Sequence, residues 1–215
     1  MSARENILAR IRARQGKPAA PTAAEREAMR SHIQSHSGSP RPRMEWDPVA
    51  RFRECALGLA STVDEVAALE DVPAAVARYL EASGLPRAAV CWQEFMTLDW
   101  SDAGIRVEAR AARETDLVGI TGAFCAIAET GTLMTMSGRD TPSTVSLLPE
   151  THIAVVTQSR IVRGMEEAWQ LMREEVGRPP RAVNFISGPS RTADIEQTVT
   201  LGAHGPYRVH IILVG

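Results

Sequence analysis

The residues best suited to chemistry lie near the C-terminal end, in the stretch 183–196. There the apolar run Val-Asn-Phe-Ile stops at Ser-Gly-Pro-Ser, and a short polar segment compatible with a helix follows. A helix N-terminus offers unpaired N–H groups and a favourable dipole, so it attracts anions. A guanidinium adds a planar fork that matches carboxylate or phosphate. The stretch therefore predicts an anion site formed by Ser187, Gly188, Ser190, Arg191 and Thr192.

Three further residues are candidates for proton transfer or nucleophilic attack. His204 stands between two glycines in the turn Gly-Ala-His-Gly-Pro, and His152 follows Leu-Leu-Pro-Glu-Thr. Glu129 opens the turn Glu-Thr-Gly-Thr between two apolar segments. The histidines are candidate bases or donors, and Glu129 is a candidate acid, base or nucleophile.

Each of these residues also has a purely structural interpretation. Ser187 or Ser190 could cap the expected helix while Arg191 pairs with Asp194 or Glu196 on the same helix. His152 could cap its own loop, and His204 could hydrogen-bond a strand end. Glu129 could be a solvated turn residue. The residue types alone leave both interpretations open.

Composition narrows the class of protein. The chain has 215 residues, 44% of them hydrophobic, and a formal net charge of −2. These values suit one globular domain with an arm and give no general case for nucleic acid or an anionic membrane. Residues 1–43 are locally basic, with nine arginines or lysines against three glutamates.

The cysteines favour neither disulfides nor a metal centre. Cys55, Cys91 and Cys125 are odd in number and far apart, and no CxxC motif or zinc or iron–sulfur spacing occurs. We expect no metal and no cofactor in this chain, and a reducing, cytoplasmic location. The N-terminus lacks the apolar core of a signal peptide, and no run approaches the ~20 apolar residues of a membrane span.

The order of predicted elements indicates an α/β fold. Residues 1–45 form an N-terminal helical arm and linker, with helices at 4–14 and 22–32. Residues 46–215 alternate short apolar strands with helices, which predicts a mostly parallel sheet with helices on both faces. Ligands of such sheets lie beyond the carboxyl ends of the strands. We therefore expect the strand at 181–186 to deliver Arg191 to that edge.

The common nucleotide and hydrolase fingerprints are missing. No GxGxxG motif follows a strand, no GxxxxGK[ST] motif occurs, and the sequence Gly-Pro-Ser-Arg-Thr lacks the closing glycine of a GxSxG elbow. These absences disfavour a dinucleotide-dependent dehydrogenase, a P-loop NTPase and an α/β-hydrolase.

Long segments resemble one known family. The C-terminal segment NFISGPSRTADIEQTVTLGAHGPYRVHIILV, preceded in order by ETGTLM and SLLPETHIAVV, is similar to the lactate-utilisation protein C (LutC/YkgG) family, the LUD-domain proteins. The resemblance covers roughly residues 46–215. It implies a fold like that of the NagB/RpiA/CoA-transferase class. It also implies a role in a bacterial cytoplasmic system that oxidises L-lactate to pyruvate.

The resemblance also implies partners. Two companion proteins of that system resemble iron–sulfur oxidoreductase subunits, so we expect the clusters in those partners and none here. The expected ligand is a small carboxylate or a phosphate-bearing molecule. Two alternatives stay open: an autonomous enzyme of the CoA-transferase or sugar-phosphate isomerase type with Glu129 as nucleophile or base, and a binding or regulatory subunit whose basic arm docks a cluster-bearing partner. The sequence does not settle the oligomeric state.

Overall fold

The computed structural model describes every residue except 1, 19, 37, 39, 42 and 193–199. The chain divides into two compact units, Met1–Arg43 and Met44–Gly215.

The first unit contains two capped helices. Helix α1 (Ala3–Arg14) begins after Ser2 and helix α2 (Ala23–Ser35) after Thr22, each with a complete capping box. Both predicted helices are thus present, and the Thr22 hydroxyl accepts from the Glu25 N–H at 3.2 Å. Neither helix buries a side chain, and several apolar residues are exposed: Ile7, Ile11, Met29 and Ile33.

The second unit is built on a six-stranded sheet in which every neighbouring pair is parallel. Its order is β1-β12-β7-β4-β2-β3. The strands are β1 (Thr62–Val66), β2 (Ala88–Cys91), β3 (Arg106–Ala109), β4 (Val118–Gly122), β7 (Thr151–Thr157) and β12 (Arg208–Val214). The predicted α/β class is confirmed. The four strands from β12 to β2 are almost wholly buried, which explains why they read as continuous apolar runs.

A second, four-stranded sheet has the order β8-β5-β6-β9. Strand β5 is parallel to β8, whereas β6 is antiparallel to both β5 and β9. Its strands are β5 (Cys125–Ile127), β6 (Thr132–Met136), β8 (Ile161–Val162) and β9 (Val183–Ile186). The expectation that the strand at 181–186 belongs to the parallel sheet is therefore wrong. Periodicity identifies a strand, but its partner is chosen by long-range packing.

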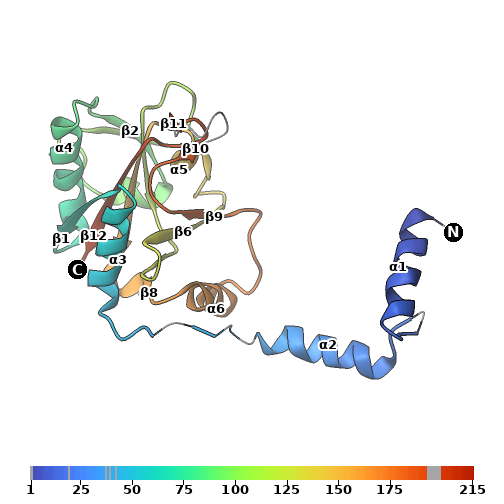
Figure 1. Ribbon diagram of the computed structural model, residues 1–215. Coiled ribbons are helices and arrows are strands. Elements are labelled where there is room, and N and C mark those ends of the chain that lie inside the picture. Colours follow the sequence, from blue (N-terminus) through green and yellow to red (C-terminus); the bar gives the residue numbers. More distant parts are fainter. Residues whose placement is uncertain (1, 19, 37, 39, 42, 193–199) are drawn as a thin grey trace. The chain divides into compact units, whose positions relative to one another are not determined.

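Helices and sheets stack in layers (Figure 1). One face of the parallel sheet packs on α4 (Val72–Ala82), which begins after the short 3₁₀ segment η1 (Leu69–Asp71) and buries Val76 and Leu80. The other face packs on the small sheet and α3 (Pro48–Gly58) through alternate residues such as Ala154 and Val156. The far side of the small sheet is covered by α6 (Met165–Glu175). Because successive side chains of a strand point to opposite faces of the sheet, each buried strand contributes residues to two separate cores.

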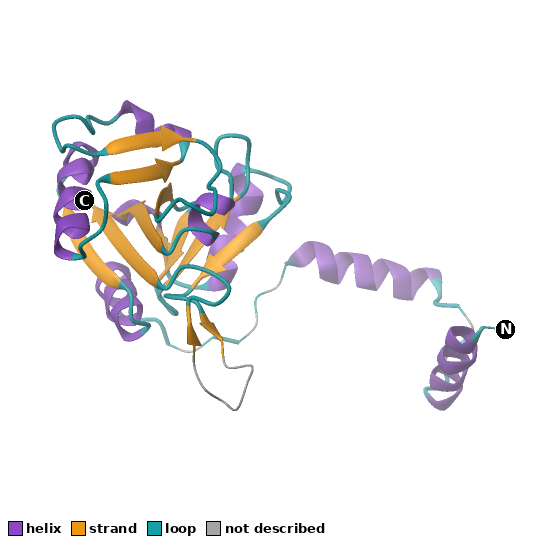
Figure 2. Ribbon diagram, turned by 90° about the horizontal axis from the view of Figure 1, so that it is seen from above, coloured by secondary structure: helices purple, strands orange, loops and turns teal. Residues whose placement is uncertain are grey.

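The elements at the sheet edges are short. They are the 3₁₀ segments η2 (Gln93–Thr97) and η3 (Gln158–Arg160), the four-residue helix α5 (Thr144–Leu147), and the strands β10 (Arg191–Thr192) and β11 (Thr200–Leu201). Strands β10 and β11 pair antiparallel and lie side by side in Figure 2. Within the described part of the chain, no helix is long and apolar enough to cross a membrane.

Candidate functional site

The predicted anion-binding stretch lies at the amino-terminal rim of the parallel sheet. The Ser190 N–H donates to the Pro206 carbonyl at 2.8 Å, and Pro206 stands just before β12. The Tyr207 N–H donates to the carbonyl of Glu150, the residue just before β7, at 2.9 Å. The expectation that this stretch sits beyond the carboxyl ends of the strands is therefore wrong, because β9 enters from the other sheet. In Figure 1, β10 and β11 lie at the end of β12 opposite to the C-terminus.

No helix begins at Arg191 either. Arg191 and Thr192 form β10, which pairs with Leu201 and Thr200, so their backbones are extended. The rest of the expected helix falls on residues 193–199, outside the described part of the chain. Arg191 and Thr192 therefore do not form the first turn of a helix, and they offer no helix N-terminus to an anion.

Arg191 instead contacts the end of α3. Its Nη2 donates to the Leu59 carbonyl at 3.1 Å, where α3 leaves carbonyls without helical partners. A cation is favoured at a helix C-terminus by the helix dipole. Gly188 packs on the same carbonyl with φ +79°, a conformation and a closeness that a side chain would oppose. This geometry assigns Arg191 a structural contact, and its predicted role as a ligand clamp stays a prediction.

The turn that contains Glu129 meets this stretch through hydroxyl groups. Thr132 Oγ1 is hydrogen-bonded to Thr130 Oγ1 at 2.8 Å and to Ser187 Oγ at 2.7 Å. Gly131, with φ +65°, lies so close to α3 that an added Cβ would stand 2.6 Å from the Ala56 nitrogen. The Glu129 side chain is half-buried and makes no hydrogen bond or ion pair with a described residue. The structure thus brings Glu129 and Ser187 to one region, as the site hypothesis requires.

His204 lies on the neighbouring loop and is exposed. The Gly202 N–H donates to the Ser190 carbonyl at 2.9 Å, and Gly205 packs against the Ser190 side chain. The two glycine-rich turns are therefore adjacent, as the sequence suggests.

His152 is not part of this surface. Strand β7 begins at Thr151, so His152 lies within the strand, and its side chain is fully buried. Its Nε2 is hydrogen-bonded to Thr121 Oγ1 at 2.7 Å, and its Nδ1 has no partner in the described structure. Burial lowers the pKa of His152 to about 4. The expectation that His152 precedes the strand and faces a cleft is wrong. The neutral ring packs in the protein interior and is hydrogen-bonded to Thr121.

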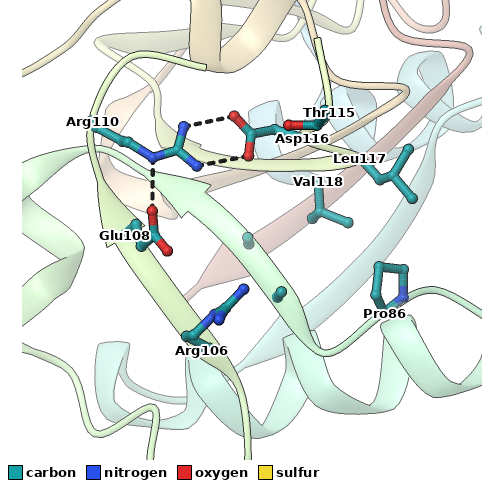
Figure 3. Close-up of a pocket in the computed structure, with 10 residues that line it drawn as sticks. Pro86, Arg106, Glu108, Arg110, Thr115, Asp116, Leu117 and Val118 are labelled. Carbon is teal, nitrogen blue, oxygen red and sulfur yellow. Dashed lines mark hydrogen bonds and ion pairs between the residues drawn. The ribbon is translucent and has the colours of Figure 1, made fainter. Parts of the chain in front are cut away.

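A cavity of about 250 Å³ lies over β2, β3 and the start of β4 (Figure 3). Its charged groups largely neutralise one another. Arg110 makes two bonds to Asp116, of 2.7 and 2.8 Å, and one of 2.8 Å to Glu108. The hydrogen bonds from Arg110 hold the pKa of Asp116 below its usual range. This network ties the loop after β3 to the sheet, and the two arginines that line the cavity, Arg106 and Arg110, balance its two carboxylates.

The opposite rim of the sheet has the topology of a binding crevice. The chain that leaves β2 runs through η2, and its Phe95 and Trp100 pack in the core on the α4 face. The chain that leaves the neighbouring strand β4 enters β5 and β6 and packs in the core on the other face. Adjacent connections that diverge to opposite faces leave a crevice at the carboxyl ends of their strands.

Glu94 projects into this rim directly after β2. Its carboxylate lies over Gly122, the last residue of β4, in the space that a side chain there would fill. The side chain is solvent-accessible, yet the surrounding protein desolvates it and raises the pKa of Glu94. Within the described residues its carboxylate makes no hydrogen bond or ion pair. An accessible, partly desolvated and unpaired carboxylate is typical of a functional cleft.

A cavity of about 160 Å³ opens beside Gln93 on the same rim, beyond the ends of β2 and β3. Arg139 and Asp140 line it from the loop after β6, and the Gln93 N–H donates to the Asp140 carbonyl at 3.2 Å. The sequence pattern does not single out Glu94, because it lies in a short 3₁₀ segment without a hydrophobic period of its own. The available signal was a glutamate within three residues of an apolar strand, together with a glycine that ends the next buried strand.

Metal ligation is not indicated by the described residues, since no group of three or more His, Cys, Asp or Glu side chains is arranged to hold an ion. Burial raises the pKa of the Cys91 thiol to about 11 and that of Cys125 to about 12, so both are poor thiolates.

Fold and rim together define an α/β protein with a parallel sheet, a second sheet on one face and a crevice at the carboxyl edge. The LUD domain family model matches residues 60–214, and the chain belongs to that family. A crystal structure of a DUF162 family protein from Deinococcus radiodurans shares this fold. Its TM-score is 0.57 and its identity 23%, over 82% of this chain and 100% of that one.

Two relatives called Lactate utilization protein C come from bacteria. Lactate utilization protein C from Bacillus subtilis (strain 168) is 37% identical over 134 residues, 57% of this chain and 56% of that protein. The protein of the same name from Exiguobacterium sp. (strain ATCC BAA-1283 / AT1b) is 40% identical over 125 residues, 55% of this chain and 53% of that one. The matched part thus spans about half the length of these relatives.

Proposed function

We propose that this protein is a component of a bacterial L-lactate utilisation system that oxidises L-lactate to pyruvate together with iron–sulfur partner subunits. The observation that carries the proposal is the LUD domain match over residues 60–214, together with relatives named Lactate utilization protein C at 37% and 40% identity.

The cysteines support a division of labour with the partners. Cys91 and Cys125 are buried, and their raised pKa values oppose the thiolate form that an iron–sulfur cluster needs. In the proposal, electrons therefore pass to clusters in the partner subunits, and this chain contributes binding and positioning of the substrate.

The basic arm is the proposed contact with those partners. Residues 1–43 carry nine arginines or lysines against three glutamates, and both helices expose apolar side chains, Ile7 and Ile11 on α1 and Met29 and Ile33 on α2. Exposed apolar residues beside cationic ones suit an acidic partner surface with an apolar centre. Deletion of residues 1–43 should abolish co-purification with the iron–sulfur subunits while residues 44–215 stay folded.

Growth on L-lactate tests the function. We expect a strain that lacks the gene to lose growth on L-lactate and to keep growth on pyruvate, with recovery when the full chain is restored. Equal growth of the deletion strain on both carbon sources would refute the proposed function.

A second candidate function is an autonomous enzyme of the CoA-transferase type with Glu129 as nucleophile. The half-buried Glu129 side chain, which makes no hydrogen bond or ion pair with a described residue, favours keeping this candidate. It requires that the Glu129 carboxylate attack the thioester of an acyl-CoA, so that the acyl group is bonded to Glu129 and CoA leaves as the thiol. Mass spectrometry of the intact chain, with Glu129→Gln as the control, decides between the two.

A further inference from the structure

Three observations concern the carboxyl rim of the parallel sheet. The connections after β2 and β4 diverge to opposite faces of the sheet. Glu94 occupies the space over Gly122 that only a glycine leaves open. A cavity of about 160 Å³ lies beside Gln93 at the ends of β2 and β3.

We propose that this crevice, with Glu94 and Arg139 on its borders, is the site that binds a small 2-hydroxy acid. The inference rests on the proposed function for the identity of the acid. The location of the site does not rest on the proposed function, because it is inferred from the sheet topology and from the placement of Glu94 and Arg139.

Arg139 and Glu94 each recognise one group of the acid. Arg139 lines the cavity, and its guanidinium makes no hydrogen bond or ion pair within the described part of the chain. A free guanidinium suits the carboxylate of the acid. Glu94 accepts the hydrogen bond of the 2-hydroxyl group, a role that an unpaired carboxylate fills well.

The charges also select the size of the ligand. Among the described residues, the rim carries the carboxylates of Asp140, which lines the cavity, and of Glu94, which follows the lining residue Gln93. Two arginines line the cavity, and Arg110 is already bound to Asp116 and Glu108, which leaves Arg139 for a ligand. A ligand with several negative charges, such as a nucleotide or a sugar phosphate, would be repelled. A monoanion with a hydroxyl donor is accommodated because its single charge meets Arg139 and its hydroxyl meets a carboxylate.

The other cavity of the sheet does not offer this chemistry. There Arg110 is already bound to Asp116 and Glu108, so a ligand would have to break an existing network (Figure 3). The amino-terminal rim likewise uses Arg191 to hold the end of α3.

The test is titration of the full chain with L-lactate, followed by amide NMR shifts. Shifts should appear at Gln93, Glu94, Gly122 and Arg139 with one common Kd. Propionate, which has the same skeleton without the hydroxyl, should bind about tenfold more weakly, because a hydrogen bond to a charged group is lost. Glu94→Gln should weaken L-lactate binding about tenfold and leave propionate unchanged. Glu114→Gln, an exposed glutamate in the loop before β4, should change neither affinity.

Several results would overturn the inference. Amide shifts confined to Ser187 and Arg191 would place the ligand at the amino-terminal rim. If no amide shifts at all, this chain does not bind L-lactate. Equal L-lactate affinity of Glu94→Gln and the wild type would remove Glu94 from the site. In all these cases the growth test of the deletion strain still decides the proposed function by itself.

Discussion

Arg191 donates a hydrogen bond to the carbonyl of Leu59, across 3.1 Å, and so joins β10 to the C-terminal end of α3. Arg191→Ala should lower the free energy of unfolding by about 0.5–1 kcal/mol, the range for an exposed cation at a helix C-terminus. It should leave the affinity for L-lactate within twofold. Urea unfolding and L-lactate titration measure the two effects, with Arg181→Ala as an exposed control that makes no described contact. Loss of L-lactate binding at unchanged stability would return the site to this rim.

Gly131 is expected to be far less tolerant of a side chain than a glycine of equal backbone conformation. Gly131 and Gly84 have φ values of +65° and +64°, but an added Cβ meets α3 only at Gly131. Gly84→Ala should cost about 1–2 kcal/mol for the left-handed conformation. Gly131→Ala should cost about 1–3 kcal/mol more, because α3 must shift. Equal losses in thermal or urea unfolding would show that α3 does not pack on this turn as described.

Stability should depend on pH through two buried histidines. Burial lowers the folded-state pKa of His152 and of His210 to about 4, below the ordinary value of 6.5. Their contribution is therefore present above pH 6.5 and is lost as the pH falls from 6.5 toward 4, because the unfolded chain takes up the protons first. The loss is up to about 3 kcal/mol for each histidine.

Urea unfolding between pH 7.5 and 4.5 measures this loss. His152→Gln, which retains a hydrogen-bonding side chain beside Thr121, should flatten the profile, whereas His32→Gln in the exposed α2 should not. A wild-type profile that stays level between pH 6.5 and 4.5 would contradict the buried, neutral state of the rings.

Asp116 should act on stability and not on ligand binding. Its carboxylate receives two bonds from Arg110, and both side chains are mostly buried, 13% and 25% exposed. Asp116→Asn should lower the free energy of unfolding by about 1–2 kcal/mol. Glu108→Gln, at 48% exposure, should lower it less. If Asp116→Asn instead weakens L-lactate binding at unchanged stability, the cavity of Figure 3 is a ligand site.

The sequence predicted the α/β class and most elements because local signals carry them. Asp47 followed by Pro48 marks the start of α3, and its carboxylate accepts from the Ala50 N–H at 2.8 Å. The spacing of Val72, Val76 and Leu80 marks α4. Such patterns depend on neighbours within one turn or two residues, so a single chain displays them.

The location of the site could not be predicted in the same way. Arg191 was expected at the carboxyl edge because 181–186 has the pattern of a strand, and only its pairing with β6 shows that it belongs to the second sheet. The position of the Glu94 carboxylate depends on the absence of a side chain at Gly122, a residue that is distant along the chain and close only in the folded protein. The turn Glu-Thr-Gly-Thr and Ser187 were recognised as chemically promising, and their hydroxyls do meet. The sequence does not indicate at which rim of the parallel sheet they meet.

The most direct test of the account is pyruvate formation from L-lactate by extracts of the deletion strain, supplemented with purified full-length protein. We expect the wild-type chain to restore pyruvate formation and Glu94→Gln to restore about a tenth of the rate at low L-lactate concentration. Pyruvate formation at the full rate without any added chain would contradict the proposed function. Equal rates with wild type and Glu94→Gln at low L-lactate would contradict the crevice as its site.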